Sequence, residues 1–221
     1  MKKRSAFVDN ATLGVFRLFS GRLGKRLRES QYDENKEQWE APASGFIEHQ
    51  SRLTQISYGK AGPLARKLFF RGRPLSAAEN ACEVIAVHNA LLALGQPEDF
   101  PELLKSFSEG GICFNGIFGT SPKAVERFLL GRGLRLHSLK AGQIDEASLN
   151  ELAEECRCFI FTAFNRGQNP FHMVHTMCVT KEKDGFTVHN DNGSRRAKSL
   201  SEAILSYQGG AGHAICVIGI L

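Results

Sequence analysis

The spacing of apolar residues changes near residue 134 of this 221-residue chain, and that change most limits the folds open to it. Upstream, apolar residues recur at helical intervals in segments spanning residues 63–70, 82–94, 101–108 and 121–130. Downstream, short apolar runs typical of strands span residues 134–139, 158–164, 173–180, 186–190 and 214–220, with helices expected at 145–155 and 199–207. Helices followed by strands predict an α+β fold, with helices packed on a C-terminal antiparallel sheet.

The N-terminal part differs in composition from the rest. Residues 1–30 are basic and have an apolar helical face, whereas residues 29–40 are acidic and polar. We therefore expect a helical extension at residues 1–60 and one main domain at residues 61–221. Three roles are open to the extension: packing on the main domain, covering its site as a pro-segment does, or, for residues 1–30, contacting an anionic membrane surface.

Charge, hydropathy and cysteine content exclude several classes of function. A net charge of +5, unevenly spread, argues against a general nucleic-acid-binding protein. No apolar run approaches the roughly 20 residues that span a bilayer, and Asp9 and Asn10 interrupt the run that a secretory signal needs. The six cysteines lie in strand-like or helix-like segments rather than in a small loop-rich scaffold. We therefore expect reduced thiols and a cytoplasmic location.

One cysteine lies where a helix is expected to begin. Asn80 is suited to cap that helix, with Glu83 as its reciprocal partner, which places Cys82 in the first turn. Free N–H groups and the helix dipole favour a thiolate there, so Cys82 is a candidate nucleophile. Ser76 and Glu79 form a rival capping pair that would place Cys82 a turn deeper. A buried structural cysteine is the plainer interpretation.

A thiolate nucleophile needs a base and a group that orients the base, and the expected C-terminal hairpin contains both. If Val179 faces Phe186 across the hairpin, His175 faces Asn190 on the same side of the sheet. If the register slips by one residue, Asp191 faces His175 instead, but the apolar match is lost. We predict His175 as the base and Asn190 as its orienting partner, although Asn190 is also an ordinary turn residue.

Other histidines are weaker candidates. His172 ranks second as the base, and His213, which precedes the last expected strand, ranks third. His88 lies in the middle of an apolar helix and is expected to be a hydrogen-bonded core residue. One set of four residues is of metal-binding type: Cys156, Cys158, His172 and His175. Because their spacing is not that of a zinc knuckle, we expect no metal site.

A cysteine at a helix start, followed by a sheet in which His leads one strand and Asn or Asp ends the next, resembles the papain-like cysteine peptidases. The layout is most similar to the bacteriocin-processing peptidase domains that cleave after a double glycine, and to their uncharacterised bacterial relatives. The matching segments are residues 80–86, 90–92, 116–122 (Gly-x-x-Gly-Thr-Ser-Pro), 175–179 and 188–191. The resemblance covers about residues 62–221 and is one of order and spacing.

This resemblance implies a papain-like fold in which Cys82 is the nucleophile, His175 the base and Asn190 the orienting residue, with no cofactor. Such peptidases usually have a Gln shortly before the Cys, whose amide donates to the oxyanion. Asn80 is the nearby amide here, so its side chain and the Cys82 N–H are the candidate oxyanion donors. The Gly that usually follows the Cys is Glu83, whose carboxylate raises the Cys82 pKa unless it points away.

Three functions remain open on this basis. The leading hypothesis is a thiol peptidase that cleaves a peptide after small residues. The same Cys–His pair also suits an acyltransferase that moves an acyl group from a thioester to an amine. In the third, Glu83 and the missing Gln indicate that catalysis has been lost and that the chain is a binding module with the same fold.

Overall fold

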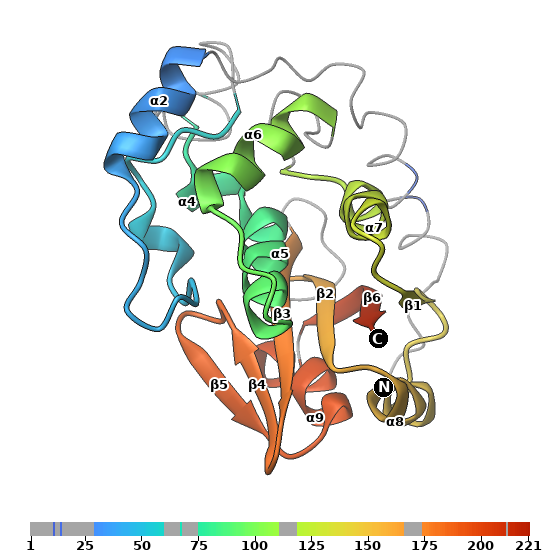
Figure 1. The fold of residues 1–221 in the computed structure, drawn as a ribbon. Coiled ribbons are helices and arrows are strands. Elements are labelled where there is room, and N and C mark those ends of the chain that lie inside the picture. Colours follow the sequence, from blue (N-terminus) through green and yellow to red (C-terminus); the bar gives the residue numbers. More distant parts are fainter. Residues whose placement is uncertain are drawn as a thin grey trace.

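The structure is a computed structural model that describes residues 11, 14, 29–59, 67, 75–110, 119–165, 174–210 and 212–221. In this part of the chain, a six-stranded antiparallel sheet lies between two layers of helices (Figure 1). The α+β class and the antiparallel sheet expected from the sequence are thus confirmed. The helix expected at residues 63–70 lies almost wholly outside the described residues, as do most of residues 1–28.

The sheet has the strand order β1-β6-β2-β3-β4-β5, so the last strand of the chain lies in its interior. The strands are β1 (Leu136–Lys140), β2 (Cys158–Phe164), β3 (Val174–Glu182), β4 (Gly185–His189), β5 (Ser194–Ala197) and β6 (His213–Ile220). The sequence predicts all of them except β5. That strand is short and mostly polar, as is common at a sheet edge, and lacks the apolar run that indicates a strand.

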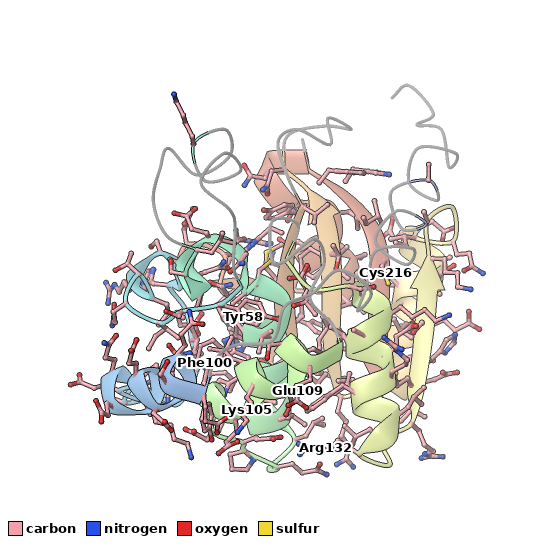
Figure 2. All side chains as sticks on the ribbon, turned by 90° about the horizontal axis from the view of Figure 1, so that it is seen from above. Tyr58, Phe100, Lys105, Glu109, Arg132 and Cys216 are labelled. Carbon is pink, nitrogen blue, oxygen red and sulfur yellow. The ribbon has the colours of Figure 1, made fainter. Side chains whose placement is uncertain are left out.

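Most of the helices lie on one face of the sheet, with α5 at the centre (Figure 1). They are α2 (Glu29–Gln38), α4 (Ala77–Asn80), α5 (Cys82–Ala93), α6 (Phe100–Gly110) and α7 (Pro122–Gly131), with a single turn η1 (Gln50–Arg52). Nearly every residue of α5 is buried, which explains its apolar sequence. Tyr58 and Phe100 are fully buried in the same layer (Figure 2).

Two helices cover the other face: α8 (Glu146–Glu155) and α9 (Leu200–Leu205), followed by the turn η4 (Tyr207–Gly210). Side chains on β2 and β3 alternate between the two layers. Ile160 and Cys178 belong to the core on the α5 side, whereas Phe161 and Met177 belong to the core under α8 and α9. Because both faces are covered, every residue of β2 is buried, and its sequence reads as one apolar run.

The strap, residues 44–53, follows α2, includes the turn η1 and contacts α5 and β4. The side-chain amide of Asn89 in α5 forms two hydrogen bonds with the backbone of Ile47, at 2.8 and 3.0 Å. His88 contacts the carbonyl oxygens of Gly45 (3.0 Å) and Glu98 (3.1 Å), which confirms it as a buried, hydrogen-bonded histidine. Residues 29–59 therefore share the core of the main domain.

The register of the β3–β4 hairpin differs from both registers considered in the sequence analysis. Val179 pairs with Val188, and Lys181 pairs with Phe186, so β4 is shifted by two residues from the preferred register. A shift of two residues keeps every side chain on the same face, and the apolar pattern therefore cannot distinguish the two arrangements. The strands also extend further, leaving a tight turn at residues 183–184.

The N-terminus of α8 provides a test of local capping. Asp145 is the N-cap residue, and its carboxylate accepts a hydrogen bond of 2.9 Å from the Ser148 N–H. Replacing Asp145 with Ala removes that acceptor. We expect the free energy of unfolding, measured by urea denaturation, to fall measurably. Asp145→Asn retains an acceptor oxygen and should lose less; equal losses for the two variants would contradict the capping role.

Candidate active site

Cys82 is the first residue of α5, and the helix begins differently from the expectation. The N-cap position is Ala81, whose side chain makes no capping hydrogen bond. Asn80 instead ends the short helix α4, and its amide donates to the Tyr58 carbonyl at 2.8 Å. The prediction that Asn80 caps the Cys82 helix is therefore wrong. Ser76 is the N-cap residue of α4 but also makes no side-chain capping bond, so the rival capping pair does not form either.

The surroundings of Cys82 favour a neutral thiol. Its sulfur donates a hydrogen bond to Glu83 Oε2 at 3.3 Å. Burial raises the Cys82 pKa well above its usual value, and the negative charge of Glu83 adds to the shift. The Thr176 N–H opposes the shift without overcoming it. The expectation that the helix dipole produces a thiolate is therefore wrong for this conformation, because desolvation and Glu83 outweigh the dipole.

Glu83 lies at the centre of a buried polar network. Besides the Cys82 sulfur, its Oε2 atom accepts a hydrogen bond from the Thr120 N–H at 3.4 Å, and Thr176 contacts the same carboxylate. Thr120 in turn bonds to the Tyr58 hydroxyl at 2.5 Å. Gly119, at φ +67°, leaves room for the carboxylate, since a Cβ there would lie 3.0 Å from Oε2. Burial raises the pKa of Glu83 to about 7.

His175 is the second residue of β3, and its hydrogen bond defines which ring nitrogen carries the proton. Its Nε2 atom is 2.7 Å from the Asn190 carbonyl oxygen. Because a carbonyl can only accept, Nε2 carries the proton and donates, and Nδ1 of the neutral ring is left with its lone pair. Burial lowers the pKa of His175, while the Asn190 carbonyl and Asp191 oppose the shift. The ring is therefore neutral at pH 7 and able to accept a proton at Nδ1.

The contact between His175 and Asn190 uses the backbone of Asn190 rather than its carboxamide. The carboxamide pairs with Gln50: its Oδ1 accepts from the Gln50 N–H at 3.0 Å, and its Nδ2 donates to Gln50 Oε1 at 3.3 Å. Asn190 has φ +66°, a left-handed conformation that Asn tolerates. Asp191, the alternative orienting residue, forms an ion pair with Arg195 at 2.8 Å.

The candidate residues lie at one end of the sheet, but they do not form a continuous chain of hydrogen bonds. β3 begins next to His175, β4 ends next to Asn190, and β6 begins at His213, opposite Phe164 in β2. Among the described residues, no hydrogen bond joins Cys82 to His175. Strand alternation explains this, because Thr176 faces α5 whereas His175 starts on the opposite face. His172 lies outside the described residues.

The sequence analysis did not identify two residues of this region, and for a third it missed the contact with the sulfur. Glu48 of the strap accepts hydrogen bonds from His189 Nδ1 (2.7 Å) and from the Asn190 N–H (3.1 Å). Gln50 connects Asn190 to α4, because its side-chain amide also donates to the Ala77 carbonyl at 3.0 Å. Glu83 was seen as a departure from the family pattern, but not as a contact of the sulfur. The first two contacts join residues about 140 positions apart, so no local signal predicts them.

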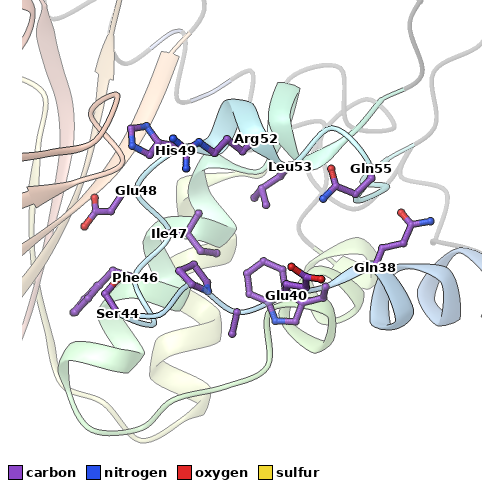
Figure 3. A pocket seen from close by; sticks show the side chains of 13 residues that line it. Gln38, Glu40, Ser44, Phe46, Ile47, Glu48, His49, Arg52, Leu53 and Gln55 are labelled. Carbon is purple, nitrogen blue, oxygen red and sulfur yellow. The ribbon is translucent and has the colours of Figure 1, made fainter.

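The strap also borders an open pocket of about 660 Å³ (Figure 3). Its lining comes from residues 38–55 and mixes apolar side chains, such as Ile47 and Leu53, with the polar side chains of Glu48, His49 and Arg52. Cys82 and His175 are not part of this lining. The pocket thus lies apart from the candidate nucleophile.

Two features are absent from the described part of the chain. There, no three His, Cys, Asp or Glu side chains are arranged to hold a metal ion. Within the same residues, none of the helices has the length and apolar character needed to cross a membrane. The five described cysteines are free thiols, all buried: Cys82, Cys156, Cys158, Cys178 and Cys216.

Comparisons with known proteins do not assign the chain to a family. No protein-family model matches it, and a search of curated proteins finds no match.

Proposed function

We propose that the chain is a papain-like thiol hydrolase, most simply a cysteine peptidase, in which Cys82 is the nucleophile and His175 the base. In this proposal Asn190 orients the imidazole through its backbone carbonyl. Asn80 remains the candidate oxyanion donor beside the Cys82 N–H, although its amide would first have to leave the Tyr58 carbonyl. The substrate is a peptide or another acyl compound.

One observation carries this proposal: the proton arrangement of His175. Its Nε2–H donates to the Asn190 carbonyl, which leaves Nδ1 basic at the end of the sheet where α5 begins with Cys82. A general base needs this combination of a fixed tautomer and a pKa below the working pH. The Cys82 N–H, as one of the first N–H groups of α5, has no partner within the helix and is suited to bind an oxyanion. Catalysis requires His175 to approach the sulfur when substrate binds.

The proposal predicts selective, His175-dependent modification of one thiol. A peptidyl vinyl sulfone should label Cys82 ahead of the other cysteines, as read by peptide mass spectrometry. If His175 accepts the thiol proton directly, His175→Ala should slow that labelling about 100-fold, since an acid–base group contributes at least this much. Cys216→Ser, which removes another buried thiol, is the matched control and should have no effect. Labelling of Cys82 at the rate of Cys216 would exclude the thiol enzyme, whereas labelling unaffected by His175→Ala would exclude His175 as the base that activates the thiol.

A binding module with the same fold is the second candidate, and one observation favours it. The hydrogen bond of Cys82 goes to Glu83 rather than to His175, and the thiol is neutral. In that case Cys82→Ala should leave ligand binding and stability nearly unchanged, and no acyl-thioester or peptide should acylate the protein. Detection of an acyl adduct on Cys82 by intact-protein mass spectrometry would exclude the binding module. Transfer to an added amine faster than hydrolysis would then indicate an acyltransferase.

A further inference from the structure

We propose that Glu83, rather than His175, is the immediate proton acceptor of the Cys82 thiol, and that the two side chains share one proton. This inference rests on the proposed function, because it assigns a role in the activation of the same nucleophile. Glu83 contacts the reacting sulfur itself, and it is therefore placed as a catalytic residue.

The contact geometry supports this role. Among the described residues, the Cys82 thiol makes its hydrogen bond to Glu83 Oε2 at 3.3 Å, and His175 makes none to the sulfur. Both side chains are almost completely buried, so water does not compete for the proton. The carboxylate is also held in place, because the Thr120 N–H donates to the same oxygen, and it lies so close to Gly119 that a Cβ there would be 3.0 Å from Oε2. A thiol that loses its proton here has a fixed acceptor within reach.

The electrostatics of the site are consistent with a proton that moves between the two groups. Burial raises the pKa of Glu83 to about 7, so its carboxylate is a far better base than an exposed one. Among the described residues, the other groups that contact Glu83 include Thr120 and Thr176, which are not charged, and the Asn80 carbonyl lies close by. Tyr207 interacts electrostatically with Cys82 and has its pKa raised to about 12 by burial, so it stays neutral. No cation among these neighbours stabilises a lone thiolate.

The proposed step conserves the proton. The Cys82 Sγ–H proton moves to Glu83 Oε2 as the sulfur electron pair forms a bond to the acyl carbon and the carbonyl pair moves onto oxygen. When the intermediate collapses, the bond to the leaving group breaks and the leaving group takes up that proton, which restores the carboxylate. Water then attacks the thioester carbonyl as His175 Nδ1 accepts its proton; the C–S bond breaks, and the departing Cys82 sulfur takes up that proton, which restores the thiol and the neutral imidazole.

The test is the alkylation rate of Cys82 by iodoacetamide as a function of pH, which needs no substrate. In the unmodified protein we expect an inflection near the pKa of Glu83, about 7. Glu83→Gln removes the acceptor but keeps the shape, and alkylation between about pH 7 and pH 8 should become at least about tenfold slower. Faster alkylation of Glu83→Gln at every pH would show that Glu83 only repels the thiolate, and would overturn the inference.

Two further variants keep the result interpretable. Glu151→Gln, which removes an exposed carboxylate from α8, should not change the profile. Glu83→Asp keeps an acid but withdraws it from the sulfur, and should give an intermediate rate with the inflection retained. If a peptidyl vinyl sulfone labels Cys82 normally in Glu83→Gln, this inference fails while the proposed function stands. If the alkylation rate of Cys82 depends on Glu83 as expected but no acyl compound reacts, the proposed function fails, while the inference that Cys82 and Glu83 share a proton stands.

Discussion

The free energy of unfolding of the unmodified protein is expected to fall by about 3 kcal/mol between pH 4.5 and about pH 7, and Glu83→Gln should abolish this fall. Burial raises the pKa of Glu83 from 4.5 to about 7, so the folded chain holds a proton in this range that the unfolded chain releases. The stabilisation is complete below the unfolded pKa and is lost as the pH rises through the folded pKa. Each unit of difference corresponds to about 1.4 kcal/mol.

The measurement is the free energy of unfolding from urea denaturation between about pH 5 and about pH 8. The two proteins should be similar in stability at the acidic end, and Glu83→Gln should be the more stable at the alkaline end. Glu151→Gln serves as the control, because an exposed carboxylate has nearly the same pKa in both states. Parallel pH curves for the unmodified protein and Glu83→Gln would show that Glu83 is not buried as described.

This loss of stability on ionisation explains why Glu83 is a functional candidate. A carboxyl group that destabilises the fold at neutral pH, next to a cysteine at a helix start, is unfavourable for packing alone. Groups with strongly shifted pKa values are concentrated at functional sites, which is the pattern that Glu83 and Cys82 follow.

Local signals in the sequence predict the elements well where one pattern has one structural meaning. β2 spans the predicted residues, because a seven-residue apolar run buried on both faces allows one assignment. α7 and α8 begin within one residue of the predicted starts at 121 and 145. The hairpin register is wrong by two residues because the alternation has a period of two. The prediction of which hairpin side chains share a face of the sheet is nevertheless right.

The candidate site is less predictable, because its contacts join distant parts of the chain. Asn80 has the right side chain for an N-cap, but the Tyr58 carbonyl, 22 residues earlier, binds its amide instead. Asn190 was expected to use its carboxamide, but Gln50 of the strap binds that group and leaves the carbonyl for His175. Such competition between hydrogen-bond partners depends on the assembled fold, so local sequence patterns do not predict it.

Replacing Glu48 with Gln is expected to lower the free energy of unfolding at pH 7 by about 2–3 kcal/mol. Glu48 Oε1 accepts from His189 Nδ1 at 2.7 Å, and its second oxygen accepts from the Asn190 N–H at 3.1 Å. Gln has one acceptor oxygen, so one of these buried donors loses its partner. Phe46 stacks on the His189 ring at 4.3 Å, which holds the strap against β4 and leaves little freedom to rearrange.

The pH dependence of this effect has the opposite sign to that of Glu83. Burial alone raises the pKa of Glu48, but the hydrogen bonds from His189 and the Asn190 N–H outweigh it and hold the pKa below its usual value. The stabilisation by Glu48 is therefore present above the unfolded pKa of 4.5 and is lost as the pH falls through the folded pKa. The difference between the unmodified protein and Glu48→Gln should thus shrink in acid.

A double-mutant cycle with His189→Gln distinguishes this pair from a general effect of the substitution. If Glu48 acts through His189, the two losses should be less than additive, whereas independent sites would add. Glu37→Gln on α2, an exposed carboxylate, is the matched control and should cost almost nothing. Because Glu48 also holds the Asn190 N–H, Glu48→Gln should slow labelling of Cys82 by a peptidyl vinyl sulfone. Normal labelling with the full loss of stability would confine Glu48 to a structural role.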